Sequence, residues 1–486
     1  MPVEQRESHH GLWGYRRIFS RCLVKNSLFA RCDRAFIRAR GVTTRGTALA
    51  HRVDVSAFLR AVIVLGGVLL LALPGTAQRP DTDVERDLRR FYESAGDRAV
   101  WIDARGRPTL DAQRVLARLR DVAEDGLEPG EYRVDELGRQ AVGLDAGEPF
   151  SAVDAAAFDV GLTASVLRYF RHLHLGRVSP RALGFHLDHA IEPHDFSARL
   201  HAALADHSFE RAVADLRPAF AQYRGLRQAL TDYRASEPAR ARQIELAMER
   251  LRWLPDVGGQ RLLVVNIPMY YLWGWEAERA AGVPAIGMAA IIGRAGSTKT
   301  PVFSAAMTAV VFNPDWTVPD SIVRNEILPA IEANPQYLAQ HHMEMTSTGG
   351  TPRVRQRAGP WNALGRVKFL LPNVHDVYLH DTPSQSLFSR ERRDFSHGCV
   401  RVADPLALAE WVMQDEAEWT PDSIRAAIAR GATRTVRLTR QTHVVIFYMT
   451  AAFVPEDGSI RFADDIYGHD ARLDAWLQAQ GEEGER

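Results

Sequence analysis

A cysteine and two histidines near the end of the chain have a spacing that suits covalent acyl transfer. Cys399 follows His397 by two residues and follows His380, the end of an apolar run, by nineteen. A thiol attacks only as the thiolate, and a free cysteine with a pKa of about 8.5 needs a base or a positive field to supply it near neutral pH. If His380 ends one strand and Cys399 begins its neighbour, the imidazole reaches the sulfur, whereas His397 alternates to another direction. We therefore expect Cys399 as the nucleophile and His380 as the base.

Gly398 stands directly before the expected nucleophile. A glycine there removes the side chain beside the sulfur and lets a substrate carbonyl approach. It also leaves the backbone N–H groups of Gly398 and Cys399 free to form an oxyanion hole. Together these groups are the parts needed for acyl transfer through a thioester.

The first 77 residues predict an export signal. The chain has 486 residues with 60 basic and 60 acidic side chains, but residues 1–60 hold 12 basic against 4 acidic ones and residues 61–77 hold none. The apolar run 61–73 follows Arg60 and ends in small residues, which is the layout of a secretory signal. An uncleaved inner-membrane anchor is the alternative, although thirteen residues fall short of the roughly 20 that span a bilayer. We expect a periplasmic protein with residues 1–77 as a basic leader.

If this leader is removed, the mature protein keeps only one of the three cysteines. Cys22 and Cys32 lie ahead of the expected cut, so Cys399 alone remains. A single cysteine has no internal disulfide partner in an oxidising compartment, and such a thiol is a candidate reactive group. The alternative is a small buried hydrophobic side chain. Only three lysines occur in the chain, Lys25, Lys299 and Lys368, a scarcity typical of a GC-rich genome.

The composition and the pattern along the chain predict an α+β protein. The hydrophobic content of 46% and the zero net charge exclude a disordered chain and a polytopic membrane protein, and they give no sign of nucleic-acid binding. Residues 78–255 show helical periodicity and residues 256–470 short β-branched runs separated by turn residues. The polar tail, 471–486, receives no assigned structure. The expected helices are 115–123, 155–173, 197–216, 220–234, 239–252, 319–333 and 404–413, and the expected strands are 262–267, 270–275, 285–292, 309–312, 367–371, 377–379, 435–438 and 444–454.

The residues around Cys399 resemble the signature of the L,D-transpeptidase family with a YkuD-type catalytic domain. His380 is separated by fifteen residues from Ser396-His397-Gly398-Cys399-Val400-Arg401. The flanking segments 310–319, 327–329, 362–369 and 380–393 are similar to the long, scaffold-bearing branch of Gram-negative bacteria. The resemblance covers roughly residues 242–470 strongly and the helical region more weakly. It implies a helical scaffold domain over 78–255 and a mainly-β catalytic domain over 256–470, with a mobile cap at about 322–365.

The resemblance also implies roles for further residues. The backbone carbonyl of Asp381 would hold the imidazole tautomer of His380. Tyr378 would border the donor site, and Arg401 would either support the site, meet substrate carboxylates or form a structural ion pair. The substrate-binding set thus comprises Tyr378, Ser396, His397 and Arg401. His397 is expected as a supporting hydrogen bonder, and Ser396 either assists the oxyanion hole or satisfies the backbone.

The reaction that the family carries out would use peptidoglycan stem peptides. The thioester of Cys399 with a donor tetrapeptide would release D-alanine, and an acceptor amine would then form a 3→3 cross-link. Carbapenem-type β-lactams would acylate the same thiol. Three alternatives remain: a carboxypeptidase or hydrolase, a transpeptidase that attaches a lipoprotein, and a non-catalytic envelope scaffold. No peptidoglycan-binding module separates the scaffold from the catalytic domain, since residues 233–238 run directly into the next helix.

We expect no cofactor and no metal. One stretch, 186–195, is rich in groups that can ligate metals: His186, Asp188, His189, Glu192, His194 and Asp195. Such a run between helices is more often a polar loop, and we interpret it so.

Overall fold

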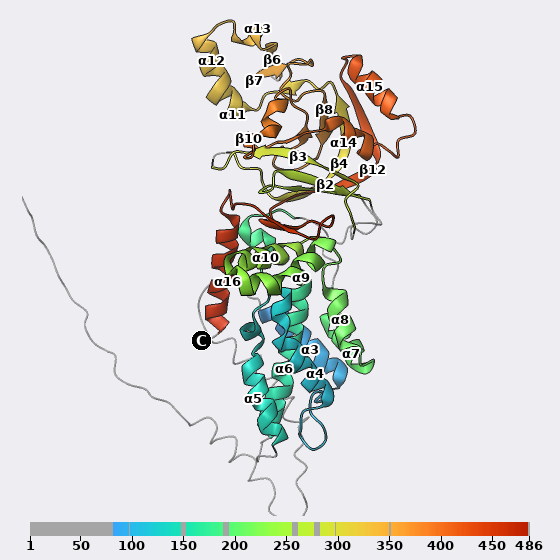
Figure 1. Cartoon of the computed structure of the whole chain (residues 1–486), viewed down its shortest axis with the longest axis vertical. Coiled ribbons are helices and arrows are strands. Elements are labelled where there is room, and N and C mark those ends of the chain that lie inside the picture. Colours follow the sequence, from blue (N-terminus) through green and yellow to red (C-terminus); the bar gives the residue numbers. More distant parts are fainter. Residues whose placement is uncertain are drawn as a thin grey trace, which may run out of the picture. The chain divides into compact units, whose positions relative to one another are not determined.

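The computed structural model describes residues 81–96, 98–146, 152–187, 194–254, 261–276, 282–296, 298–348 and 351–484 (Figure 1). A helical region is followed by a mainly-β region, which confirms the predicted α+β class. The leader, residues 1–77, lies outside the described residues, so its role stays a prediction. Within the described ranges, no helix is both long and apolar enough to cross a membrane.

The helical region is built around the long helix α6. Thr109 caps α4 by accepting a hydrogen bond from the Ala112 N–H at 3.1 Å. The helix expected over 197–216 is in fact two, because the chain turns at His207, whose φ is +51°. The elements are α3 (Asp81–Ala95), α4 (Leu110–Arg120), η2 (Val122–Asp125), η3 (Pro129–Tyr132), α5 (Val134–Asp145), α6 (Ala152–Leu175), η4 (Pro180–Leu183), α7 (Phe196–Ala205) and α8 (Phe209–Leu216).

Two further helices, α9 (Ala221–Ser236) and α10 (Pro238–Leu251), pack with the sheet rather than with α6. Leu226 and Ile244 are buried in the same core as Val264 of the sheet. The side chain of Gln222 also exchanges hydrogen bonds of 2.6 and 2.8 Å with the Phe453 backbone. The hydrophobic core therefore does not divide at residue 255, where the sequence placed the domain boundary.

The β region forms one large sheet with the strand order β10-β3-β11-β9-β8-β4-β12-β1-β2. Strand β2 also pairs with β3, so the order of strands closes on itself. The short strands β9 and β11 lie parallel and adjacent near its middle. The strands are β1 (Arg261–Asn266), β2 (Tyr271–Trp275), β3 (Ile286–Gly293), β4 (Phe303–Phe312), β8 (Val367–Leu370), β9 (Leu379–His380), β10 (Asp394–Ser396), β11 (Val400–Val402) and β12 (Arg434–Phe447).

The end of the chain differs from its expected form in two places. The strands expected at 435–438 and 444–454 are mostly one strand, β12, whose pairing with β4 shifts register between Arg437 and Thr442. A separate two-stranded sheet follows, with β13 (Ala451–Phe453) and β14 (Ile460–Phe462). The tail is not structureless, because α16 (His469–Gly484) buries Leu473 and Leu477 in the core of the sheet. Helices α14 (Pro405–Val412) and α15 (Pro421–Ala429) complete this region.

The cap expected at about 322–365 is a small unit with its own core. Val318, Ile327 and Val354 form a hydrophobic cluster separate from that of the large sheet. A three-stranded sheet, β5-β7-β6, lies beside short helical segments. The elements are β5 (Trp316–Thr317), α11 (Asp320–Ile322), the π-helical turn η5 (Val323–Ile327), α12 (Leu328–Ala333), α13 (Tyr337–Gln340), β6 (Met343–Thr348) and β7 (Thr351–Gln356). Gly349 and Gly350 lie outside the described residues.

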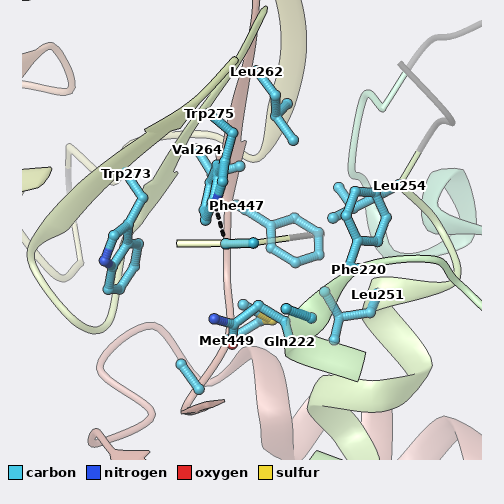
Figure 2. Close-up of a pocket in the computed structure, with 13 residues that line it drawn as sticks. Phe220, Gln222, Leu251, Leu254, Leu262, Val264, Trp273, Trp275, Phe447 and Met449 are labelled. Atoms are coloured by element: carbon cyan, nitrogen blue, oxygen red, sulfur yellow. Dashed lines mark hydrogen bonds between the residues drawn. The ribbon is translucent and has the colours of Figure 1, made fainter. Parts of the chain in front are cut away.

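Figure 2 shows an apolar pocket between the ends of α9 and α10 and the strands β1, β2 and β12. Aromatic and aliphatic side chains line it, among them Phe220, Leu251, Val264, Trp273 and Phe447. Its lining includes no nucleophile and no ionisable side chain. The chemistry therefore has to be sought elsewhere on the sheet.

Candidate active site

The predicted base lies on strand β9, and the predicted nucleophile directly precedes the neighbouring strand β11, on the same face of the sheet. His380 pairs with Arg401 across β9 and β11, and Cys399 precedes Arg401 by two residues. Lys368 pairs with His380 across β8 and β9. Since side chains alternate along a strand, these four side chains and Tyr378 share a face. The alternating residues point the other way, into the core: Val367, Phe369, Leu379, Val400 and Val402.

His380 is held in one tautomer by the backbone. Its side chain is buried, and Nδ1 lies 2.5 Å from the carbonyl oxygen of Asp381. A carbonyl only accepts hydrogen bonds, so Nδ1 carries the proton and Nε2 keeps a lone pair. Burial lowers the pKa of His380 to about 3, and the charges of Arg401 and Lys368 act in the same direction. The imidazole is therefore neutral near pH 7 and can accept a proton.

The carboxylate of Asp381 fixes the chain around this carbonyl. It accepts hydrogen bonds from the backbone N–H groups of Arg366 at 2.7 Å and Thr382 at 2.6 Å. Gly365 has a φ of +61°, and a Cβ there would lie 2.3 Å from the Asp381 carboxyl. Only glycine allows this close approach. The side chain of Asp381 thus orients its own backbone, and through it His380.

Cys399 is a partly buried thiol in a positive environment. Burial raises its pKa, whereas hydrogen bonds from the backbone N–H and hydroxyl of Tyr378, and the charges of Lys368 and Arg401, act to lower it. The Sγ atom also lies 3.9 Å from the Asp376 carbonyl oxygen. The resting site therefore pairs a neutral thiol with a neutral imidazole, and the proton has to move as the substrate arrives.

The loop before Cys399 is shaped by glycine and serine. Gly398 has a φ of +116°, a conformation that other residues rarely adopt. Ser396 Oγ donates to the Cys399 carbonyl at 2.5 Å and accepts from the Gly398 N–H at 3.2 Å. Ser396 therefore satisfies the backbone, one of its two expected roles. The Gly398 N–H is not free in this structure, contrary to expectation, and has to leave Ser396 if it is to bind an oxyanion.

Thr300 and Tyr467 support the same loop from two distant parts of the chain. Thr300 Oγ1 donates to the Gly398 carbonyl at 2.8 Å and accepts from the Gly293 N–H at 2.8 Å. The Tyr467 hydroxyl accepts from the Thr300 N–H at 3.2 Å and donates to the Gly293 carbonyl at 2.5 Å. Both side chains are buried. Sequence reasoning missed them because nothing near either residue marks the contact.

Two cations flank the thiol. The Lys368 ammonium lies 3.7 Å from the ring centroid of Tyr378. Arg401 has a buried Nε with no hydrogen-bond partner, and within the described ranges it forms no ion pair with an acidic side chain. Of its three expected roles, the structural ion pair is therefore not found there. Sequence reasoning also missed Lys368, although the scarcity of lysine was a signal: Lys299 contacts Tyr467, so both lysines after the leader belong to the network of the site.

His397 points to the cap. Its Nε2 lies 2.6 Å from Glu326 Oε1 in the π-helical turn η5. This contact fits a supporting hydrogen bonder better than a base. Tyr378 also approaches the cap, through a hydrogen bond with the Trp316 side chain, and its ring centroid lies 5.7 Å from that of His380. The expected substrate-binding residues thus lie around Cys399 and beneath the cap.

The described side chains of the histidine-rich stretch do not come together at one point. His186 packs on His375 with ring centroids 5.0 Å apart, and His194 packs on His174 at 4.1 Å. Asp195 caps α7 by accepting from the Ala198 N–H. Among the described residues, no three His, Cys, Asp or Glu side chains gather as metal ligands. The remaining members, Asp188, His189 and Glu192, lie outside the described ranges.

Comparisons with known proteins agree with this geometry. Residues 86–230 match a family described as a Scaffold domain, and residues 260–446 match a family described as the L,D-transpeptidase catalytic domain. The second match includes His380, Asp381 and the segment 396–401. A protein of Haemophilus influenzae named "Putative L,D-transpeptidase" is 33% identical over 248 residues, which are 47% of this chain and 48% of that protein. The chain thus spans about half the length of this relative.

Two solved structures resemble parts of the chain. They are described as the avibactam carbamoyl enzyme of Ldtfm and as Bd1075 of Bdellovibrio bacteriovorus. The first is 13% identical over 40% of this chain and 51% of that one, with a TM-score of 0.20. The second is 14% identical over 46% and 58%, with a TM-score of 0.17. The family matches, rather than these distant likenesses, show that the chain carries an L,D-transpeptidase catalytic domain preceded by a Scaffold domain.

Proposed function

We propose that the chain is a peptidoglycan L,D-transpeptidase that forms 3→3 cross-links through a thioester on Cys399. One observation carries the proposal: Cys399 directly precedes strand β11 and His380 ends the adjacent strand β9 on the same sheet face, and the Asp381 carbonyl leaves Nε2 of His380 as the proton acceptor. This pairing of nucleophile, base and orienting group is what covalent acyl transfer requires.

In the first step, Nε2 of His380 takes the proton from Sγ as the sulfur attacks the carbonyl of the diaminopimelate L-centre in the donor tetrapeptide. The C–N bond to the terminal D-alanine then breaks, and the imidazolium returns the proton to the leaving amine. The oxyanion is stabilised by the Cys399 N–H and by the Gly398 N–H once it leaves Ser396. The products of this step are the thioester and free D-alanine.

In the second step, the side-chain amine of an acceptor diaminopimelate attacks the thioester. Nε2 of His380 accepts a proton from this amine and returns it to the departing sulfur, which restores the neutral pair. An acceptor water gives a tripeptide instead, and a lipoprotein lysine gives an attached protein. These alternatives share the first step and differ only in the nucleophile that enters beneath the cap.

Purified disaccharide-tetrapeptide tests the proposal, with the products identified by mass. Cross-linked dimer together with free D-alanine is the expected result, and tripeptide alone would indicate hydrolysis. Cys399→Ala should abolish both products while the thermal unfolding temperature stays near that of the wild type. If Cys399→Ala still releases D-alanine, or if the wild type releases none, the proposal is wrong.

We also propose that the protein works in the periplasm and that carbapenem-type β-lactams acylate Cys399. The expected leader supports the first proposal, and the exposed strained carbonyl of such drugs suits a thiol with an adjacent base. Fractionation of cells and sequencing of the mature N-terminus test the location. Intact mass after drug treatment should show one adduct that Cys399→Ala lacks.

A further inference from the structure

Lys368 is a cation that the reaction as described does not use. It comes from the central strand β8, and its side chain is only partly exposed. The ammonium lies 3.7 Å from the centroid of the Tyr378 ring, which fixes its position through a cation–π contact. Such a contact recovers part of the cost of moving the charge out of water.

The acidic side chains near this site do not pair with Lys368. The Asp381 carboxylate accepts hydrogen bonds from two backbone N–H groups. Asp376 is exposed and forms no ion pair with Lys368. Within the part of the chain that the structure describes, Lys368 has neither a salt bridge nor a hydrogen-bond acceptor.

The site carries an excess of positive charge that an anion could neutralise. Lys368 and Arg401 place two positive charges on the face that carries Cys399. The proton that leaves Sγ stays on His380 as an imidazolium, so formation of the thiolate leaves the net positive charge of the site unchanged. Lys368 therefore lacks a counter-charge until a substrate brings it, and partly buried charges are stable when they are paired. An ammonium and a guanidinium both bind carboxylates well.

The order of strands favours one carboxylate of the donor peptide. Three neighbouring strands follow one another across the sheet: β11, which Cys399 directly precedes, then β9, which ends at His380, then β8, which contains Lys368. The sulfur attacks the carbonyl carbon, and His380 protonates the leaving nitrogen. The carboxylate of the leaving D-alanine is two bonds beyond that nitrogen. Of the two register partners of His380, Arg401 lies on the strand that follows Cys399 and Lys368 lies on the opposite side, where a leaving group that extends away from the sulfur would meet it.

We propose that Lys368, pinned on the ring of Tyr378, is the binding residue for the terminal carboxylate of the donor peptide. This subsite would make the enzyme select donors that end in a free carboxylate, and it rests on the proposed function for the identity of that donor. Arg401, on the strand of the nucleophile, would meet the developing thiolate.

Measuring each enzyme variant with each of two donor peptides tests the proposal. The donors are the tetrapeptide ending in D-alanine and the same peptide ending in D-alaninamide, and the readout is kcat/KM for release of the last residue. Lys368→Met should lower this value about 10- to 100-fold for the acid, the size expected of a charge-assisted hydrogen bond, and less than about 3-fold for the amide. Lys368→Arg should restore most of the preference for the acid. Equal losses with both donors would overturn the proposal.

A second readout needs no peptide. Iodoacetate carries a carboxylate and iodoacetamide does not, and both alkylate Cys399, as peptide mapping by mass can follow. The ratio of the two rates should fall at least about 3-fold in Lys368→Met and stay near wild type in Lys368→Arg, because the local positive charge favours the anionic reagent. An unchanged ratio in Lys368→Met would overturn the subsite. If neither donor were processed by the wild type, the proposed function would fail while this readout still decided the role of Lys368.

Discussion

His397 and Glu326 of the cap are hydrogen-bonded, with Nε2 and Oε1 2.6 Å apart. His397 is two residues from Cys399, whereas Glu326 belongs to a unit with its own hydrophobic core. A unit that is packed separately can move as a body when its few outside contacts break. The pair thus links the position of the cap to the loop that carries Cys399.

Glu326→Gln should loosen the cap. Both partners are partly exposed, so the pair is worth about 0.2–1 kcal/mol, which corresponds to at most about a 5-fold change in opening. Hydrogen exchange of residues 320–333 should accelerate by up to this factor. Glu344→Gln is the matched control, because Glu344 pairs with Arg355 inside the cap and not with the loop before Cys399. Exchange in Glu326→Gln that equals wild type would contradict the link.

The neutral thiol and imidazole predict an unusual pH profile. Burial raises the pKa of Cys399 and lowers that of His380 to about 3. Alkylation of Cys399 by iodoacetamide should therefore rise with an apparent pKa above the value of about 8.5 for a free thiol. A preformed thiolate–imidazolium pair would instead give a reaction rate that already levels off near pH 6, and stopped-flow alkylation from pH 5 to 10 distinguishes the two.

The same burial of His380 should make the fold sensitive to acid. Its folded pKa of about 3 lies below the unfolded value of about 6.5, so the unfolded chain binds more protons between these limits. The free energy of unfolding should therefore fall as the pH drops from 6.5 towards 3, by up to about 1.4 kcal/mol per pH unit for this one group. In His380→Gln, urea unfolding should lose that part of the slope. An unchanged slope in His380→Gln would contradict this prediction.

Tyr467 should act on catalysis through the loop that it supports. Its hydroxyl bridges Gly293 and Thr300, and Thr300 holds the Gly398 carbonyl. Tyr467→Phe should lower kcat for D-alanine release more than it raises KM, because the loop orients the attacking sulfur rather than the bound peptide. Tyr92→Phe, which removes a buried hydroxyl among the scaffold helices, is the control for a general loss of stability. A pure rise in KM, or equal effects in both variants, would contradict this role.

Local signals brought the candidate site residues around Cys399 together in the prediction, and their catalytic roles stay proposals. The residues from Tyr378 to Arg401 lie close together in the sequence, and alternation along two short strands brings His380 and Cys399 to one face. Most helices and strands were found in the same way, from periodicity and turn residues. The confirmed α+β class follows from those local patterns.

Contacts between segments that are distant in the sequence could not be predicted from such local patterns. Glu326 and His397 are 71 residues apart, and Tyr467 and Thr300 are 167 apart. The tail is a partial exception, since Leu473, Trp476 and Leu477 have helical spacing that its polar composition obscured. Strand β12 was predicted as two strands because a polar stretch crosses its middle, where the pairing with β4 is interrupted between Arg437 and Thr442.

Gly365 offers a test of how Asp381 holds His380. A Cβ at Gly365 would overlap the Asp381 carboxyl at 2.3 Å, whereas one at Gly431 would meet nothing within 4 Å, although the φ values are similar at +61° and +71°. Gly431→Ala should thus cost only the left-handed backbone penalty of about 1–2 kcal/mol. Gly365→Ala should cost about 1–3 kcal/mol more from overpacking and should also lower kcat, because displacement of Asp381 moves the carbonyl that orients the imidazole. Equal unfolding free energies and unchanged kcat in the two variants would show that the carboxyl shifts aside without disturbing His380.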